Sequence, residues 1–366
     1  MQLHQWGWNA LLQQKFEELN RGEECLPARV VYAQRESYRV ICAAGELTAH
    51  VSGRFRHIAS VPADFPTAGD WVGIRRDGEE GAGSDSAGGP AVIRFLLPRI
   101  TWLSRQAAGQ EVREQLICAN LDWVFLVSGL DRDFNLRRIE RYLSAVYEGG
   151  AQPLVVLNKV DLCPDPEAKI REVQGVAFSV PVICTDALGG TGMEQLDPYL
   201  QEGKTAAFAG SSGVGKSTLL NQLLGREAQA VRGVRGDGKG RHTTTHRELF
   251  LIPGRGMLID NPGMRELQLW AHEQSLGDTF ADVERLASRC RFGDCSHGHE
   301  PGCAVRKAAA AGELPAGRLD SYLKQKRELE RLDQAADMSS RERSNLRRRE
   351  ARVWEKQIRE RFKDSY

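Results

Sequence analysis

The sequence predicts a multidomain chain with a small β-barrel, an α/β domain built on a parallel sheet, and a mainly helical C-terminal domain. Three observations predict this architecture. Short alternating strands fill the first hundred residues, continuous apolar runs followed by glycine-rich or polar loops fill the middle, and three cysteines cluster with a histidine near residue 300. At 366 residues the chain is long enough for two or three domains with separate cores.

The first part is expected to comprise an N-terminal extension, residues 1–24, and an OB-fold barrel, residues 25–104. The extension contains a short amphipathic helix from Asn9 to Leu19. Short alternating strands joined by glycine-containing turns are typical of a small barrel. Such barrels often bind oligonucleotides, although a fold alone establishes no function. The five expected strands are residues 29–32, 38–41, 46–51, 70–74 and 91–95.

The second part, residues 105–268, is expected to form the α/β domain. Its apolar runs are typical of parallel strands that are buried on both faces. Ligands bind open α/β sheets at the carboxyl ends of the strands, so the loops that follow these runs are candidate binding loops. The four runs are residues 121–127, 153–157, 205–209 and 257–259, and a helix is expected over residues 136–147.

The loop after the third run, GSSGVGKS, has the P-loop pattern and lies between a strand and a helix, the context that this motif requires. Backbone N–H groups at the helix N-terminus can surround the α- and β-phosphates. Lys216 can neutralise the β- and γ-phosphates, and the Ser217 hydroxyl can ligate Mg²⁺. An ordinary glycine-rich turn is the alternative. The expected phosphate-binding residues are Gly210, Ser211, Ser212, Gly213, Val214, Gly215, Lys216, Ser217 and Thr218.

The loop after the second run, Asn158-Lys159-Val160-Asp161, predicts that the bound base is guanine. The Asp161 carboxylate can accept from the ring N–H and the exocyclic amine of guanine together, whereas adenine has no such pair of donors. The stem of Lys159 can lie across the purine, and Asn158 can tie this loop to the P-loop. Four residues of this pattern alone can be a simple turn, but beside a P-loop and after a buried strand the indication is strong.

A third loop, Asp260-Asn261-Pro262-Gly263, follows the fourth run. Asp260 can hold Mg²⁺ through water, and the N–H of Gly263 can meet the γ-phosphate. An Asn-Pro-Gly turn is the alternative. Many GTPases carry a water-orienting Gln at the next position, where this chain has Met264, so slow intrinsic hydrolysis is expected.

Residues 236–245 are glycine-rich and charged, which suits a segment that senses the nucleotide. Thr244 is expected to complete the Mg²⁺ ligands together with Ser217 and Asp260. His242 is expected to reach the attacking water, so that His242, Lys216 and Thr244 form the catalytic set. A surface histidine without catalytic role is the alternative for His242.

The last part, residues 269–366, carries the Cys/His cluster. Three thiolates and an imidazole in the spacing C-x4-C-x-H-x5-C supply four soft ligands for one tetrahedral Zn²⁺. Four protein ligands leave no open position, so the metal is expected to be structural, and a redox-active cysteine pair is the alternative. His299 is the alternative to His297 as the histidine ligand of the metal. The expected ligands are Cys290, Cys295, His297 and Cys303.

The charge balance restricts the partners. A net charge of +1 excludes a uniformly basic surface for nucleic acid, so RNA contacts must come from local patches. Residues 341–366 contain ten Lys or Arg against five Asp or Glu, which fits either an RNA contact or a solvated helix. No apolar stretch reaches the length of a membrane span, and the first residues lack a signal-peptide pattern. A cytoplasmic monomer is expected.

The order of the motifs is unusual, because the base-reading loop precedes the P-loop, whereas it comes last in conventional GTPases. The α/β domain is therefore predicted to be circularly permuted. The chain resembles the RsgA family of GTPases, also called YjeQ or EngC. The resemblance lies in the motifs NKxD, GxSGVGKS, HTTT and DxPG, which occur in this order between a five-stranded barrel and a C-x4-C-x-H-x5-C loop. The resemblance extends from about residue 25 to about residue 335 and includes DRDFN at 131–135 and RYL at 141–143.

The resemblance implies a GTPase that binds the immature small (30S) ribosomal subunit and its rRNA, assists late maturation and hydrolyses GTP to GDP when docked there. It also implies guanine recognition by the NKVD loop, zinc ligation by the Cys/His cluster and a catalytic role for His242. Asp186-Ala187 stands where the family usually has Ser-Ala, which leaves that base contact open. A GTP-dependent RNA-binding or translation factor for another RNA, and a scaffold that does not hydrolyse GTP, are the alternative functions.

Overall fold

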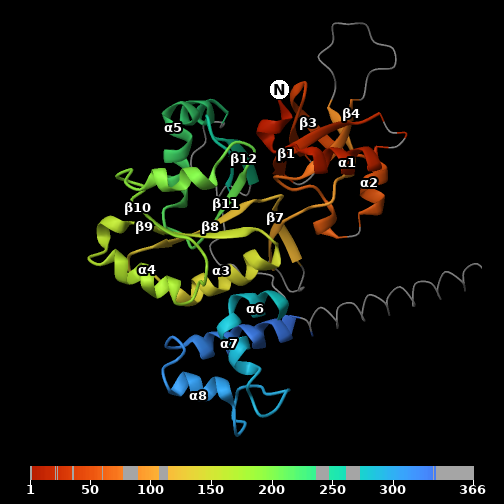
Figure 1. Ribbon diagram of the computed structural model, residues 1–366. Helices are drawn as coiled ribbons and strands as arrows, with labels where there is room; N and C mark the ends of the chain where they lie inside the picture. Colours follow the sequence, from red (N-terminus) through yellow and green to blue (C-terminus); the bar gives the residue numbers. More distant parts are fainter. Residues whose placement is uncertain are drawn as a thin grey trace, which may run out of the picture.

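The structure is a computed structural model. It describes residues 2–20, 22, 24–34, 37–59, 61–76, 90–106, 114–235, 247–260, 273–332 and 334. Figure 1 shows three tiers: the barrel with β1, β3 and β4 labelled, the α/β sheet with its helices, and the helical part that carries α6 to α8. None of the described helices combines the length and the apolar character that a membrane span requires.

The first tier is a closed five-stranded barrel, as expected. Its strands pair in the order β1-β2-β3-β5-β4, and an additional pairing of β1 with β4 closes the ring. Every expected strand is present, because apolar residues alternate along each one and fill the barrel interior, among them Val30, Val40 and Ile74. The strands are β1 Leu26–Gln34, β2 Ser37–Cys42, β3 Gly45–Val51, β4 Trp71–Arg76 and β5 Ala91–Leu96, and the helix α2 Gly53–Ile58 follows β3.

The second tier comprises six strands in the order β10-β9-β8-β11-β13-β12, which are parallel except for the last, β12. β11, the strand before the P-loop, lies in the middle, so the strands that come first in the sequence form one half of the sheet and the later ones form the other. The strands are β8 Trp123–Gly129, β9 Gln152–Asn158, β10 Val182–Thr185, β11 Thr205–Ala209, β12 Arg247–Leu251 and β13 Met257–Asp260.

Three helices accompany this sheet: α3 Leu136–Glu148, α4 Pro166–Gln174 and α5 Lys216–Arg235. Asn135 caps α3, because its side chain accepts from the backbone N–H groups of Arg137 and Arg138. α5 is interrupted at Gly225, which has non-helical angles of φ 70° and ψ 173°. The helix that the P-loop pattern predicts after the loop is therefore present up to Gly225.

The barrel and the α/β sheet are continuous, because β1 pairs antiparallel with β12. The N-terminal segment lies at this joint. Its helix α1 Ala10–Leu19 begins at the cap Asn9 and buries Leu12 and Phe16. Trp8 contacts Trp71 of the barrel with ring centroids 4.7 Å apart. A hairpin that the sequence analysis did not foresee, β6 Trp102–Gln106 and β7 Glu114–Ala119, forms a separate two-stranded sheet.

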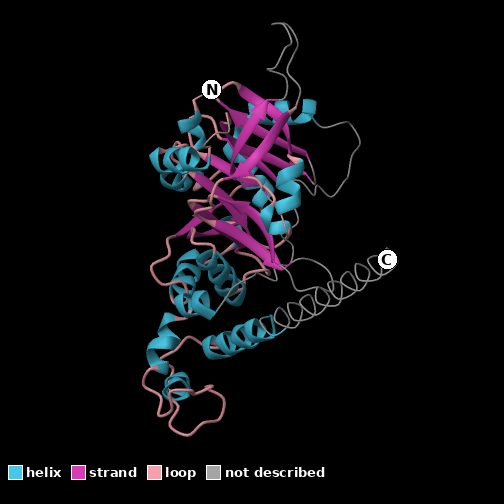
Figure 2. Cartoon of the chain, turned by 90° about the vertical axis from the view of Figure 1, so that its right-hand side faces the viewer, coloured by secondary structure: helices cyan, strands magenta, loops and turns pink. Residues whose placement is uncertain are grey.

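The third tier consists of α6 Glu273–Thr279, α7 Ala281–Ala287, α8 Ala304–Ala310 and a helix over residues 318–332. α6 and α7 are separate helices, because Phe280 between them leaves helical geometry at φ −112° and ψ 38°. Phe280 is fully buried and contacts Tyr322. Figure 2 shows the contrast between this helix-and-loop part and the strand-rich tiers.

Candidate functional site

The predicted binding loops lie at one edge of the α/β sheet. Asn158 is the last residue of β9 and pairs in register with Gly129 of β8 and Thr185 of β10. β11, which leads into Gly210, is parallel to both β8 and β13. The carboxyl ends of β8, β9, β10, β11 and β13 therefore meet at the same edge, where open α/β sheets bind their ligands.

The P-loop joins β11 to α5 in a form that requires glycine. Gly210 has φ 150° and Gly215 has φ 101°. A Cβ at Gly210 would lie 2.3 Å from the carbonyl oxygen of Val127, and one at Gly215 would lie 2.1 Å from Nδ2 of Asn158. Lys216 begins α5, and its Nζ donates to the carbonyl oxygens of Gly210 at 2.6 Å and Ser211 at 2.5 Å. The ammonium group is thus held over the loop at a helix N-terminus, where anions bind.

Asn158 joins three loops. Its side chain is buried, and Nδ2 donates to the carbonyl oxygen of Val214 in the P-loop at 2.8 Å. Its Oδ1 accepts from Thr185 Oγ1 at 3.1 Å and from the backbone N–H of Ala187 at 3.0 Å. The structure therefore contains the tie between the NKVD loop and the P-loop that the sequence suggested. The role of Thr185 was not foreseen, although a buried Thr at the end of a strand is a detectable signal.

The rest of the NKVD loop presents Lys159 and Asp161. Lys159 has a left-handed backbone with φ 64°, and its Nζ donates to Oδ2 of Asp131 at 2.6 Å. This hydrogen bond holds the pKa of Asp131 below its ordinary value. Val160 and Asp161 lie in a short 3-10 turn, and Asp161 is exposed. An exposed carboxylate beside an anchored Lys stem can accept from a purine edge.

The Asp186-Ala187 segment lies next to Asn158 as a tight turn. The Asp186 carboxylate accepts from the backbone N–H groups of Leu188 and Gly189, both at 3.0 Å. Asp186 thus stabilises its own turn, while Ala187 is buried with its N–H on Asn158.

The expected Mg²⁺ and catalytic residues are only partly within the described structure. Ser217 is the second residue of α5 and is exposed, and Asp260 ends β13, half-buried. His242, Thr244 and Gly263 lie outside the described residues, as does Met264.

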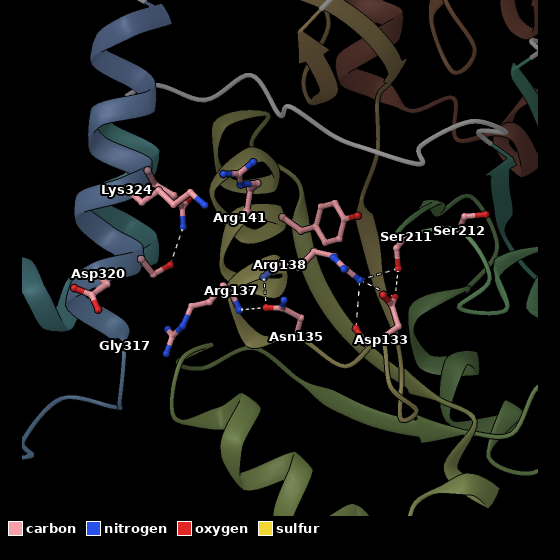
Figure 3. Close-up of a pocket in the computed structure, with 13 residues that line it drawn as sticks. Asp133, Asn135, Arg137, Arg138, Arg141, Ser211, Ser212, Gly317, Asp320 and Lys324 are labelled. Carbon is pink, nitrogen blue, oxygen red and sulfur yellow. Dashed lines mark hydrogen bonds and ion pairs between the residues drawn. The ribbon is translucent and has the colours of Figure 1, made fainter.

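A cleft of about 920 Å³ opens beside the P-loop, between α3 and the helix over residues 318–332. Figure 3 shows Arg138 of α3 reaching Asp133 and Ser211 in this cleft. Hydrogen bonding to Arg138 keeps the pKa of Asp133 below its ordinary value. The sequence predicts no role for Asp133 or Arg138, because nothing in their spacing connects them with a loop more than seventy residues away.

The Cys/His cluster is assembled in the third tier. One ligand atom from each of Cys290, Cys295, His297 and Cys303 lies within 4.8 Å of all the others. Sγ of Cys290 lies 3.9 Å from Sγ of Cys303 and 3.7 Å from Nδ1 of His297. Bonds of about 2.3 Å at tetrahedral angles place sulfur ligands about 3.8 Å apart, so the cluster has the dimensions of a tetrahedral metal site.

Comparisons with known proteins agree with this geometry. The model of a family described as RsgA GTPase matches residues 96–270. The small ribosomal subunit biogenesis GTPase RsgA of Syntrophotalea carbinolica is 44% identical over 338 residues, which cover 90% of this chain and 90% of the relative. The protein of the same name from Opitutus terrae is 45% identical over 330 residues, again with 90% of both chains covered.

Two solved structures are similar in fold. The crystal structure of YjeQ from Thermotoga maritima has a TM-score of 0.60 and 27% identity, and the match covers 83% of this chain and 98% of that chain. YloQ, described as a circularly permuted GTPase, has a TM-score of 0.58 and 25% identity over 84% of this chain and 96% of that chain. With its barrel, its permuted sheet and its Cys/His cluster, this chain belongs to the RsgA family of circularly permuted GTPases.

Proposed function

We propose that this chain binds the small (30S) ribosomal subunit and assists its late maturation, hydrolysing GTP to GDP and phosphate at a rate that the subunit stimulates. The observation that carries the nucleotide part is the position of Asn158, whose side chain contacts the P-loop carbonyl of Val214 and the N–H of Ala187. This contact brings the base-reading loop to the phosphate-binding loop although their order in the chain is reversed. The partner is supported by the names of the relatives, which are small ribosomal subunit biogenesis GTPases.

In this proposal the residues of the site divide the work by chemistry. Asp161 accepts from the two donors of guanine, the Lys159 stem covers the purine, and the loop Gly210–Thr218 surrounds the phosphates with Lys216 on the β- and γ-phosphates. Ser217, Thr244 and Asp260 hold Mg²⁺, which when bound neutralises charge on the phosphates. His242 orients the water that attacks the γ-phosphorus, and Gly263 donates its N–H to the γ-phosphate.

The metal of the Cys/His cluster is proposed to be one structural Zn²⁺. Soft thiolates with one imidazole favour zinc, and a site with four protein ligands is closed to substrate. Cys303 and His297 are buried, and Cys303 also caps α8 by accepting from the N–H of Arg306. Metal analysis of the purified chain should give about one zinc per chain, and substitution of Cys303 by Ser should lower that content while wild-type GDP affinity is kept. A chain that folds fully without metal would contradict this role.

The proposed partners are the small subunit, its rRNA, GTP and GDP, and the proposed state is a cytoplasmic monomer. We propose that the chain is divided into an N-terminal extension up to residue 24, an OB-fold up to residue 104, a GTPase domain up to residue 268 and a zinc-binding domain after it. The family relationship favours the small subunit over another RNA, which stays the second candidate.

The test is GTP turnover by the full-length chain, measured alone, with purified small subunits and with large subunits. The proposal predicts slow turnover alone, clear acceleration by small subunits and none by large subunits. Lys216→Ala should abolish turnover in every condition, and His242→Ala should remove the acceleration while GDP still binds. Equal rates with and without small subunits would contradict the proposed partner, and acceleration by a different RNA would support the second candidate.

A further inference from the structure

Ser211 follows the first glycine of the P-loop, and a side chain of α3, that of Arg138, contacts it. The Ser211 carbonyl oxygen accepts from Nζ of Lys216 at 2.5 Å, so the orientation of this peptide unit directs the ammonium group. The Ser211 hydroxyl donates to Oδ2 of Asp133 and accepts from Nη1 of Arg138 at 3.0 Å. Arg138 also donates to Oδ2 of Asp133 at 2.6 Å, which closes a triangle of three side chains (Figure 3).

We propose that Arg138 is a positioning residue for the nucleotide phosphates, which acts by holding Ser211, and through Ser211 the side chain of Lys216, in the binding geometry. The inference rests on the proposed GTPase function and adds a residue from α3 to it. Arg138 supplies both a charge and a planar donor, and the Asp133 carboxylate fixes the guanidinium while it accepts a hydrogen bond from the Ser211 hydroxyl.

Buried polar contacts anchor α3, the helix that carries Arg138. α3 is attached to the third tier through a buried ion pair, in which Glu140 Oε1 lies 2.7 Å from Nη1 of Arg318. Within the third tier, Asp282 Oδ1 lies 2.8 Å from Nη2 of the same Arg318. Arg318 and Glu140 have no exposed side-chain surface. Side chains that rise from such a fixed element can hold a neighbouring loop in one geometry. The same connection means that a displacement of the third tier would reach the P-loop through α3.

A purely structural role of Arg138 is the alternative to a positioning role. Arg138 also donates to the backbone carbonyl of Asp133 at 3.3 Å and could simply latch the turn before α3. That turn, however, already has the Asn135 cap, and the Arg138 and Asp133 side chains remain 35% and 38% exposed. Ion pairs with this exposure contribute little to stability. A latch would affect stability alone, whereas a positioning residue affects phosphate binding at unchanged stability.

The experiment compares three single variants of the full-length chain, Arg138→Gln, Ser211→Ala and Arg141→Gln, by titration with a fluorescent GDP analogue. Arg141 is the matched control, because it lies on the same helix and lines the same cleft, but its Nη2 donates to Glu328 at 2.6 Å instead of to a P-loop residue. Thermal unfolding of the nucleotide-free chains is measured in parallel. We also measure the KM for GTP and the preference for GDP over ADP.

Arg138→Gln and Ser211→Ala should each weaken GDP binding and raise the KM for GTP about tenfold, the loss expected for one hydrogen bond to a charged group. Arg141→Gln should change both by less than about twofold. The preference for GDP over ADP should persist, because the base-reading loop is untouched. The double variant should be no weaker than either single variant, because both act through one contact. Arg138→Lys should recover part of the affinity.

Wild-type affinity in Arg138→Gln, or an equal loss in Arg141→Gln, would overturn the inference. So would a loss that follows a lowered unfolding temperature in both Arg138→Gln and Ser211→Ala. A wild-type chain that neither binds GDP nor turns over GTP would instead overturn the proposed function, so the two failures can be told apart.

Discussion

At the scale of single residues, the site depends on a few positions that do not tolerate another side chain. Gly215 is the clearest example, because its backbone has φ 101° and a Cβ there would lie 2.1 Å from Nδ2 of Asn158. The same Nδ2 donates to Val214 of the P-loop. The close approach of Gly215 to Asn158 is therefore part of the connection between the two loops.

Gly215→Ala should consequently disrupt that connection. We expect GDP affinity to fall by more than tenfold and the free energy of unfolding to fall by about 2 kcal/mol or more, from backbone strain and the clash together. Gly254→Ala is the control, because Gly254 has φ 67° but open space around its Cα. It should cost about 1 kcal/mol of backbone strain and leave GDP affinity unchanged. Equal GDP affinities for the two variants, measured by calorimetry, would contradict the account.

Asp131 carries a prediction about pH. Its pKa lies below the ordinary value because the Lys159 ammonium hydrogen-bonds to its carboxylate. A depressed pKa in the folded state means that the stabilisation is complete above the pKa of the unfolded chain, about 3.9, and is lost as pH falls through the folded value. The melting temperature of wild type should therefore exceed that of Asp131→Asn by a constant amount from pH 8 to about 5, and the gap should close below about pH 4.

Asp320→Asn is the control for this series, because the exposed side chain of Asp320 makes no hydrogen bond or ion pair within the described part of the chain. Its melting curve should follow that of wild type at every pH. A gap between wild type and Asp131→Asn that widens with acidification would show that the sign of the linkage is wrong.

The sequence predicts the residues of this site where neighbouring positions carry the pattern, and fails where the partners are distant. NKVD and GSSGVGKS are local strings whose geometry follows from strand, turn and helix, so the contact between Asn158 and the P-loop could be anticipated. The Arg138 contact with Ser211 joins positions 73 residues apart, and no local pattern indicates it.

At the scale of elements, the joint between barrel and sheet depends on Arg29. This residue is 2% exposed, and burial lowers its pKa to about 10, so it remains charged at neutral pH. Its guanidinium donates to the carbonyl oxygens of Trp6 and Asn120 and to Thr205 Oγ1, and thereby connects the N-terminal segment, the barrel and the α/β sheet.

Arg29→Ala should therefore destabilise the joint strongly. It leaves buried carbonyl groups without donors and opens a cavity, which together should lower the free energy of unfolding by about 3–5 kcal/mol. Arg255→Ala is the control: Arg255 is paired with Asp197 at 2.6 Å, and both side chains are more than a third exposed. It should cost about 1 kcal/mol or less. Urea unfolding followed by tryptophan fluorescence measures both, and equal costs would contradict the assigned role of Arg29.

Elements were predictable from the sequence in proportion to their hydrophobic signal. The five barrel strands alternate clearly, and the runs that became β8, β9, β11 and β13 are continuous and buried. β10 has only four residues and β12 is half-buried along most of its length, so neither has the pattern of a core strand.

At the scale of the whole molecule, the permutation changes the order of the chain but keeps the arrangement of the sheet. The strand before the P-loop lies between β8 and β13, and five parallel strands bring their carboxyl ends to one edge. What the sequence could not show is that the barrel and this sheet are continuous through β1 and β12. That pairing joins segments more than two hundred residues apart, and both strands also have partners within their own tiers.

The central claim is that the reversed motifs form one site that reads guanine through Asp161 and holds its phosphates through Lys216. Calorimetry of wild type and Asp161→Asn with GDP and with xanthosine diphosphate tests it most directly, because xanthine replaces the exocyclic amine of guanine by a carbonyl that an Asn amide can donate to. The account predicts that Asp161→Asn loses at least about a hundredfold in GDP affinity, as expected for a site left with an unpaired donor, and prefers xanthosine diphosphate. An Asp161→Asn chain that binds GDP as tightly as wild type would contradict it.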